Sequence, residues 1–376
     1  MKKIIEKEVL NHSNSTCSDV LLIIYGAGKN GRRYYEFLKA QGKEDIIYGF
    51  CDRNYAEIGY VEDKKVFSYE EAKKIGIPFL VSVEGVEEIK EQLAKDNQEY
   101  YSDIRQWIKH FCVGNDEKLK WLMEYYIQGD CENGQQQRKP VRETQGYCPC
   151  CEENTFFIAK NYWLRDYYQC ISCGSIPRQR ALMKVLAEEV PDWRKRSMHE
   201  SSPSGITFTF LKEQCGEYTY SYWYEDKEKG EQLGENKTNQ NLEEMTFEDE
   251  MFDVFITQDV LEHVNYPEKV LQEIARTLKP GGKHIFTVPI YVLQKSRPRI
   301  IMHNGERELI LPAVYHGNPI SEDGSLVTFD WGNDIAEWID EVTGMQSKII
   351  SFPHCQENFE NGLEADFLYV VVSEKR

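Results

Sequence analysis

The sequence predicts an α/β protein with two parallel-sheet domains and a small metal-binding module between them. Short apolar runs alternate with helix-like stretches over residues 19–113, and the alternation resumes from about residue 183. These two stretches predict the sheets, and five cysteines crowded into residues 148–173 predict the module. We expect domains at 1–113, 146–182 and 183–376, with a helix and a flexible linker over 114–145.

The first domain opens with a glycine-rich loop. A strand-like run ends at Tyr25, and Gly26, Gly28 and Gly31 follow it in a GxGxxG spacing that opens a helix-like stretch. Asp52 ends the next apolar run. Glycines let the backbone approach phosphate, the helix N-terminus attracts its charge, and a distal acid can bind ribose hydroxyls. The spacing therefore predicts a Rossmann-like nucleotide-binding domain.

This segment resembles the small Rossmann-like domains attached to enzymes of bacterial surface-sugar assembly. The resemblance implies a role in surface polysaccharide biosynthesis, with NAD or a nucleotide-sugar as the ligand. This domain has only about 95 residues, and we find no separate domain for hydride transfer. A binding role is therefore favoured over an oxidoreductase activity. A degenerate domain that binds nothing and only aids assembly is the alternative.

The cysteines have the spacing of a zinc site. Two CxxC pairs are separated by a strand-rich segment, and Cys150 is left over. Four thiolates at this spacing can meet tetrahedrally around a structural Zn²⁺, so we expect a zinc ribbon. The N-terminal stretch carries acids and lacks an export signal, which favours metal binding over disulfides. The predicted ligands are Cys148, Cys151, Cys170 and Cys173.

The most informative segment lies in the last domain. Residues 253–257 form an apolar run, and a loop with Gln258, Asp259, Glu262 and His263 follows it. An amphipathic helix comes next and stops at a Pro-Gly-Gly sequence before another apolar run. In an open α/β sheet ligands bind at the carboxyl ends of the strands, so this loop is placed for chemistry.

The segment resembles the fourth and fifth strands of class I S-adenosylmethionine-dependent methyltransferases of type 11, with their D-VLEH-x-x-P and LKPGG patterns. The resemblance implies a seven-stranded sheet whose last strands, within 346–353 and 365–375, are antiparallel. It also implies that S-adenosylmethionine is the cofactor and that Gln258 and Asp259 contact it.

The upstream loop resembles a known variant of the family with an HE-x-SP sequence in place of the usual glycines. By this resemblance Glu200 accepts from the cofactor's ammonium, while Ser202, beside Pro203, serves its carboxylate. Asn241 and Leu242 lie where the family lines the adenine. A plain acidic surface loop is the alternative for that stretch.

A hydroxyl acceptor needs a base, and histidine suits this near neutral pH. His263 and His316 both fall in predicted pocket loops, and we favour His316 as the base. Tyr315 and Asn318 are expected to shape the acceptor site. Arg178 follows the zinc ribbon, and two interpretations are open for it. It lines one wall of the acceptor pocket, or it lies in solvent at the exposed start of a helix.

Net charge and hydropathy limit the classes of substrate and partner that we expect. The net charge is −18, with 63 acidic against 45 basic residues, which disfavours nucleic acid as a substrate and with it RNA methylation. No apolar run is long enough for a membrane span. We expect a cytoplasmic enzyme that methylates a small molecule or a carbohydrate hydroxyl, and the sequence does not determine its oligomeric state. The alternatives are an NAD(P)-dependent enzyme and a non-catalytic binding protein.

Overall fold

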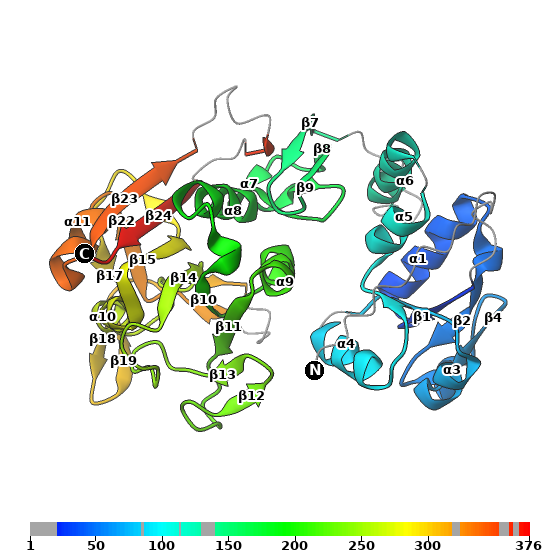
Figure 1. Ribbon diagram of the computed structural model, residues 1–376, viewed down its shortest axis with the longest axis horizontal. Coiled ribbons are helices and arrows are strands. Elements are labelled where there is room, and N and C mark those ends of the chain that lie inside the picture. The colour runs from blue at the N-terminus through cyan, green and yellow to red at the C-terminus, as the bar shows by residue number, and fades with distance from the viewer. Residues whose placement is uncertain are drawn as a thin grey trace. The chain divides into compact units, whose positions relative to one another are not determined.

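The structure, a computed structural model, describes residues 21–83, 86–112, 114–128, 140–317, 324–352, 361–363 and 368–376. The chain divides into two compact units, residues 1–138 and 139–376 (Figure 1). Within the described segments, none of the helices has both the length and the apolar character needed to cross a membrane.

The first unit is built on a six-stranded sheet in the order β3-β4-β2-β1-β5-β6. All neighbouring strands are parallel except β3 and β4. The central strand β1 is apolar and almost completely buried, as expected for a parallel strand covered on both faces. The strands are β1 (Leu22–Tyr25), β2 (Ile47–Cys51), β3 (Tyr60–Val61), β4 (Lys64–Phe67), β5 (Phe79–Val81) and β6 (Tyr100–Tyr101).

The helix predicted in the linker segment packs on the first unit. Phe37 of α1 makes edge-to-face contacts with Trp121 and Tyr125 of α6. Aromatic contacts of this kind add to the burial of apolar surface, so α6 extends the core of this unit. The helices are α1 (Lys29–Ala40), α2 (Tyr55–Ile58), α3 (Tyr69–Ile75), α4 (Val86–Lys95), α5 (Ile104–Phe111) and α6 (Asn115–Gln128).

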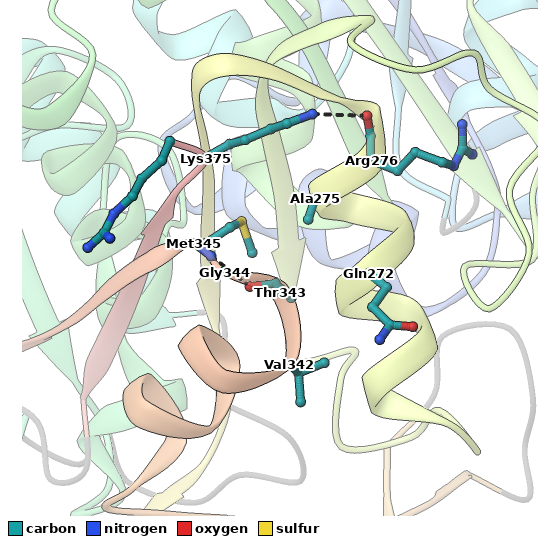
Figure 2. Close-up of a pocket in the computed structure, with 9 residues that line it drawn as sticks. Gln272, Ala275, Arg276, Val342, Thr343, Gly344, Met345 and Lys375 are labelled. Carbon is teal, nitrogen blue, oxygen red and sulfur yellow. Dashed lines mark hydrogen bonds between the residues drawn. The ribbon is translucent and has the colours of Figure 1, made fainter.

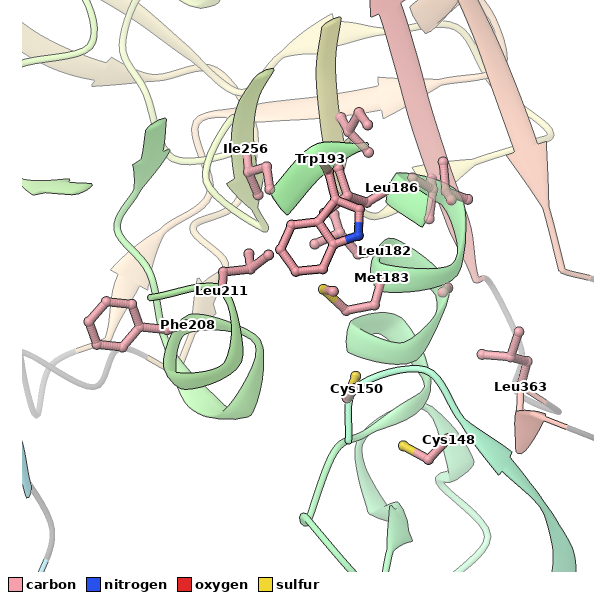
Figure 3. Packing of buried hydrophobic residues seen from close by; sticks show 14 of the residues in the cluster. Cys148, Cys150, Leu182, Met183, Leu186, Trp193, Phe208, Leu211, Ile256 and Leu363 are labelled. Carbon is pink, nitrogen blue, oxygen red and sulfur yellow. The ribbon is translucent and has the colours of Figure 1, made fainter. Parts of the chain in front are cut away.

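The cysteine module is a three-stranded antiparallel sheet of β7 (Arg142–Cys148), β8 (Glu153–Ala159) and β9 (Tyr168–Cys170), followed by α8 (Pro177–Glu189). The short helix α7 (Leu164–Tyr167) lies between β8 and β9. Cys148 and Cys150 belong to the same buried cluster as Leu182, Trp193 and Ile256 (Figure 3). The module therefore shares one core with the second sheet.

The second unit has an eight-stranded sheet in the order β12-β13-β11-β10-β14-β15-β24-β23. The predicted count of seven is wrong by one strand. The extra strand, β12, folds back antiparallel on β13 through a turn in which Asn236 has a left-handed φ of 59°. The antiparallel pairing of the last two strands is confirmed. The strands are β10 (Ser197–Ser201), β11 (Glu217–Tyr222), β12 (Gln232–Gly234), β13 (Lys237–Asn239), β14 (Phe252–Gln258), β15 (Leu278–Thr287), β23 (Gln346–Ser351) and β24 (Tyr369–Glu374).

Helices cover both faces of this sheet. Val254 and Ile256 of β14 pack in the cluster of α8 and α9 (Gly205–Gln214), while Phe255 packs with α10 (Pro267–Thr277) and α11 (Ile335–Thr343). The apolar run 206–211, whose alternating sequence is typical of a strand, is helical. Its alternation resembles a strand, but Thr207, Phe208 and Leu211 are buried along one side of α9.

Short strands connect β15 to α11 and include the hairpin that carries His316. These are β16 (Ile290–Tyr291), β17 (Arg297–Pro298), β18 (Ile300–His303), β19 (Glu306–Leu309), β20 (Tyr315–His316), β21 (Ser325–Leu326) and β22 (Phe329–Gly332). β20 and β21 pair antiparallel.

Candidate functional site

Glu200 lies at the carboxyl end of β10 and is fully buried. Its carboxylate accepts one hydrogen bond from Tyr218 Oη at 2.5 Å and another from Gln258 Nε2 at 2.7 Å. Burial raises the pKa of Glu200 to about 7, against the opposing effect of these two hydrogen bonds. The group therefore changes charge near neutral pH, and a bound cation would favour its ionised form.

Gln258 joins three elements at the carboxyl edge of the sheet. Besides Glu200, its Nε2 donates to Oγ1 of Thr207 in α9 at 3.0 Å. Thr207 is fully buried, so this hydrogen bond is shielded from water. The amide thus fixes the first turn of α9 against the ends of β10 and β14.

The loop between β10 and α9 has a strained backbone. Ser202 has a left-handed φ of 52°, a conformation that costs about 1 kcal/mol or more for a residue other than glycine. Strand β11 holds this loop, because the Ser202 amide donates to Ser221 O at 2.8 Å and Tyr222 Oη donates to Pro203 O at 2.8 Å. The loop leads into the N-terminal amides of α9, a favourable place for a carboxylate.

Asp259 also has a left-handed φ, 51°, directly after β14. Its side chain accepts from Arg165 at 2.9 Å, from Thr287 at 2.9 Å and from Arg178. Burial would raise the pKa of Asp259, but Arg178 and Arg165 lower it to about 2. The predicted cofactor ligand Asp259 and the predicted pocket residue Arg178 are thus ion-paired, and they join α7 and α8 to the strand edge.

A second polar group, which we name the histidine–glutamate cluster, consists of Glu262, His263 and His316. Its possible ligand atoms all lie within 4.8 Å of one another. His263 Nε2 and His316 Nδ1 are each 3.8 Å from Glu262 Oε1. The Glu262 side chain is 2% exposed, and its oxygens have no hydrogen-bond partner among the described residues. Burial raises the pKa of Glu262, while His316 and His263 oppose this rise.

The β20–β21 hairpin orients this cluster. His263 Nδ1 lies 2.8 Å from Leu326 O, and because a carbonyl only accepts, Nδ1 carries the proton. The neutral ring then has its lone pair at Nε2, the nitrogen nearer Glu262. The amide and hydroxyl of Thr328 donate to the main-chain oxygen of Glu262 at 2.8 and 3.0 Å. The two predicted histidines are brought together, with ring centroids 5.1 Å apart.

Of the predicted acceptor-pocket and adenine residues not yet placed, the structure describes Tyr315, Asn241 and Leu242. Tyr315 precedes His316 in β20 and is 60% exposed. Asn318 lies outside the described residues. Asn241 accepts from the amide of Glu243 at 2.9 Å through its side chain, in a local turn, and Leu242 is buried.

The four predicted cysteines form one group with their sulfurs within 4.8 Å of one another. The Sγ–Sγ distance is 3.8 Å for Cys148–Cys173 and 3.9 Å for Cys151–Cys170. A tetrahedral zinc ion with Zn–S bonds of about 2.3 Å separates its sulfurs by about 3.8 Å, so these residues fit zinc.

Arg180 fastens this ribbon to the rest of the unit. It is fully buried and donates to the carbonyl oxygens of Tyr168 at 2.8 Å and Asn361 at 2.9 Å, and also to those of Ser175 and Gly362. Its guanidinium lies over the Phe157 ring, 4.6 Å from the centroid. A charged group this well paired is structural.

The glycine loop of the first unit has three distinct positions. Gly26 has a φ of 106° and makes the tight turn, and a Cβ on Gly31 would lie 1.9 Å from Gly26 O. A Cβ on Gly28 would meet nothing within 4 Å, so the backbone is open to a ligand there. Asp52 accepts from the amides of Ala27 at 2.8 Å and Asn54 at 2.9 Å, so it holds the loop in shape.

A surface pocket of about 350 Å³ lies between α10, α11 and the end of the chain (Figure 2). Lys375, one of its lining residues, follows β24, which runs antiparallel to β15. The pocket is therefore at the amino end of β15, on the opposite edge of the sheet from Glu200 and Gln258. It is not part of the candidate site.

Tyr218 and Arg165 were not predicted to act in this site, and Glu262 was placed in the predicted loop without a role of its own. Tyr218 pairs with Glu200 in the neighbouring strand, and Arg165 comes from the ribbon, so only the three-dimensional fold brings them here. Glu262 did carry a signal. It stands beside His263 in the sequence, yet nothing in the sequence distinguishes a buried carboxylate from an exposed one.

Comparison with known proteins identifies the class. The family model described as a methyltransferase domain matches residues 204–286, which include α9, β14 and most of β15. No curated protein matches the chain.

Solved structures with similarity to the chain include an S-adenosylmethionine-dependent methyltransferase from Mesorhizobium loti, at 12% identity and a TM-score of 0.35 over 52% of this chain and 98% of that one. Another is the 1,6-didemethyltoxoflavin-N1-methyltransferase of Burkholderia thailandensis with S-adenosylhomocysteine, at 14% identity and a TM-score of 0.33 over 53% and 78%. This similarity is too low to transfer a substrate. The family match lies within the second unit and shows that the chain is an enzyme with a methyltransferase domain.

Proposed function

We propose that the enzyme methylates a hydroxyl of a sugar or nucleotide-sugar in surface polysaccharide biosynthesis. The acceptor oxygen forms a bond to the methyl carbon as the S–CH₃ bond breaks, and the electron pair of that bond stays on sulfur. S-adenosylhomocysteine leaves, and the hydroxyl proton passes to a base. Positioning supplies much of the rate of such a displacement, but the proton still needs an acceptor.

The histidine–glutamate cluster is the observation that carries this proposal. We assign the proton to His316, which is 35% exposed on its side chain and so can reach an acceptor. The buried Glu262 carboxylate beside it would stabilise the imidazolium that forms. His263 would position Glu262, and Glu200 would bind the cofactor's ammonium, with Ser202 and the amides of α9 near its carboxylate.

The sugar acceptor is supported by exposed aromatic rings on the ribbon. Tyr162 is 86% exposed, Trp163 52% and Tyr167 51%. Aromatic rings pack well on the apolar faces of sugar rings. They flank Arg165, which is paired with Asp259 at the strand edge, so the ribbon would supply one wall of the acceptor site.

The test separates cofactor binding from proton transfer. Calorimetry with S-adenosylmethionine measures binding, and S-adenosylhomocysteine formation with a panel of UDP-sugars measures turnover. His316→Ala should lose turnover and keep binding, and Glu200→Ala should lose binding. His303→Ala, an exposed histidine in β18, is the matched control. Full turnover in His316→Ala would refute the assignment of the base.

A second binding function belongs to the first unit, where the open backbone at Gly28 favours a phosphate-bearing ligand. We propose NAD or a nucleotide-sugar for this loop. Tighter binding of UDP-sugars than of NAD to the full chain would select the nucleotide-sugar, which is also the class proposed for the acceptor.

A further inference from the structure

We propose that the histidine–glutamate cluster binds a divalent transition-metal ion through Glu262, His263 and His316. This ion site is separate from the four cysteines. The proposal deepens the proposed function and rests on it in one respect, because it places the ion on the acceptor side of methyl transfer.

The first argument is the state of the Glu262 carboxylate. It is almost completely buried, and both oxygens lack a hydrogen-bond partner among the described residues. A buried carboxylate without partners is costly, so proteins pair such groups or use them to coordinate metals. The Glu262 carboxylate lies 3.8 Å from side-chain nitrogens of His263 and His316, which is too far for a hydrogen bond.

The second argument is the spacing. Nitrogen and oxygen ligands of zinc-like ions lie about 2.1 Å from the metal, which puts two ligands of a tetrahedral ion about 3.4 Å apart. The two 3.8 Å distances to Glu262 Oε1 need to shorten by only a few tenths of an ångström. All three possible ligand atoms lie within 4.8 Å of one another, so the cluster is close to a coordinated arrangement.

The third argument is the outer support of the ligands. Metal-binding histidines usually donate their other ring N–H to a carbonyl or carboxylate, which fixes the tautomer. His263 does this through Nδ1 to Leu326 O, leaving Nε2 for an ion. The hydrogen bonds from Thr328 to the main chain of Glu262 fix the second ligand in the same way.

Charge and ligand type select the ion. Among the described residues around the cluster, the acids Asp259 and Asp166 balance Arg165 and Arg178, so an ionised Glu262 adds one negative charge that neither arginine pairs. Two imidazoles with one carboxylate suit zinc, iron, cobalt or nickel, and three protein ligands leave a position open. An acceptor hydroxyl in that position would be acidified and lose its proton to solvent before transfer. With the ion bound, His316 is a ligand and the proton leaves to solvent; without the ion, His316 takes the proton as proposed above.

Co²⁺ binding to the full chain, with its ribbon zinc in place, tests the proposal. We expect one Co²⁺ per chain by calorimetry, without the sulfur-to-cobalt absorption that thiolate ligands would give. Glu262→Gln keeps the shape of the side chain and should weaken Co²⁺ at least about 100-fold, since it removes a direct ligand. His303→Ala should bind Co²⁺ like the wild type.

Thermal unfolding guards against a folding artefact. Co²⁺ should raise the melting temperature of the wild type and not that of Glu262→Gln, which should fold normally because the change removes a buried charge. The ion site would be overturned if the zinc-loaded chain bound no Co²⁺, or if Glu262→Gln bound Co²⁺ with the same affinity as the wild type. If the samples that fail to bind Co²⁺ still bind S-adenosylmethionine, the proposed methyl transfer is kept and only the ion is rejected. If the chain binds Co²⁺ but not S-adenosylmethionine, the proposed function is rejected and the ion site is kept.

Discussion

The affinity for the cofactor should depend on pH through Glu200. Its pKa is about 7, because burial disfavours the carboxylate. If the ionised form accepts from the cofactor's ammonium, binding must first remove a proton at low pH. Affinity should therefore rise with pH and level off above pH 7.

The size of this effect follows from the pKa. With a value of about 7, the ionised fraction of Glu200 rises about 25-fold between pH 5.5 and pH 7.5, or about 2 kcal/mol of binding free energy. The α-amino group of the ligand, with a usual pKa of about 7.7 to 8.0, stays mostly protonated over this interval, and its loss of charge would lower the affinity rather than raise it. The expected change thus reports on the protein.

Calorimetric titration with S-adenosylhomocysteine at several pH values measures this dependence, since that product has the same amino-acid end. Glu200→Gln should bind weakly and with little dependence on pH. Tyr218→Phe removes a hydrogen bond that lowers the pKa of Glu200, so the rise in affinity should move to higher pH. This variant retains the carboxylate and serves as the matched control.

Two results would refute the reasoning. A wild-type affinity that is flat between pH 5.5 and 7.5 would mean that Glu200 does not face the ammonium. An equal pH dependence in Glu200→Gln would assign the titration to another group, such as a histidine near the cofactor.

Three further predictions concern other parts of the molecule. Gly31→Ala should lower the melting temperature of the first unit because its Cβ would meet a carbonyl oxygen, whereas Gly28→Ala should fold normally and weaken UDP-sugar binding. Cys170→Ser should release zinc and destabilise the whole second unit in calorimetric melts, since the ribbon shares its core. Burial lowers the pKa of His199 and His284 to about 3. Below pH 6.5 the unfolded chain therefore binds protons at these histidines that the folded chain does not. The free energy of unfolding should fall by about 1.4 kcal/mol per pH unit for each histidine as the pH is lowered. Glu200 opposes this between pH 7 and 4.5, because its raised pKa stabilises the fold as pH falls; denaturant melts of His199→Gln against wild type isolate one histidine's share.

The sequence predicts the fold where its patterns are local. The apolar spacing of Val270, Leu271 and Ile274 predicts α10, and all three are fully buried in it. It fails where two structures share one pattern, as in the strand-like alternation of 206–211, which is decided by packing on α8 and the sheet. It also misses β12, a three-residue strand whose pairing depends on a turn at Asn236.

For the site, the sequence predicts residues but not their partners. The CxxC spacing is enough to bring four thiolates together, because each pair lies in one turn. The pairing of Asp259 with Arg165 and Arg178 depends on how the ribbon packs on the sheet, and so does the burial of Glu262. No local pattern contains that information, which is why Asp259 reads as a cofactor ligand in the sequence and as an ion-pair centre in the structure.

The pairing of Asp259 with Arg165 and Arg178 links the ribbon to the candidate site. Arg165 lies in α7, between the strands that lead to the two cysteine pairs, so its place depends on the ribbon's fold. Asp259 lies three residues before Glu262, and the two arginines hold it ionised. Loss of a metal from the four cysteines would release both arginines and leave two carboxylates, the half-buried Asp259 and the buried Glu262, close together without compensation. The zinc site would thus stabilise the site's electrostatics from a distance, and Cys170→Ser should impair methyl transfer even under conditions where the fold survives.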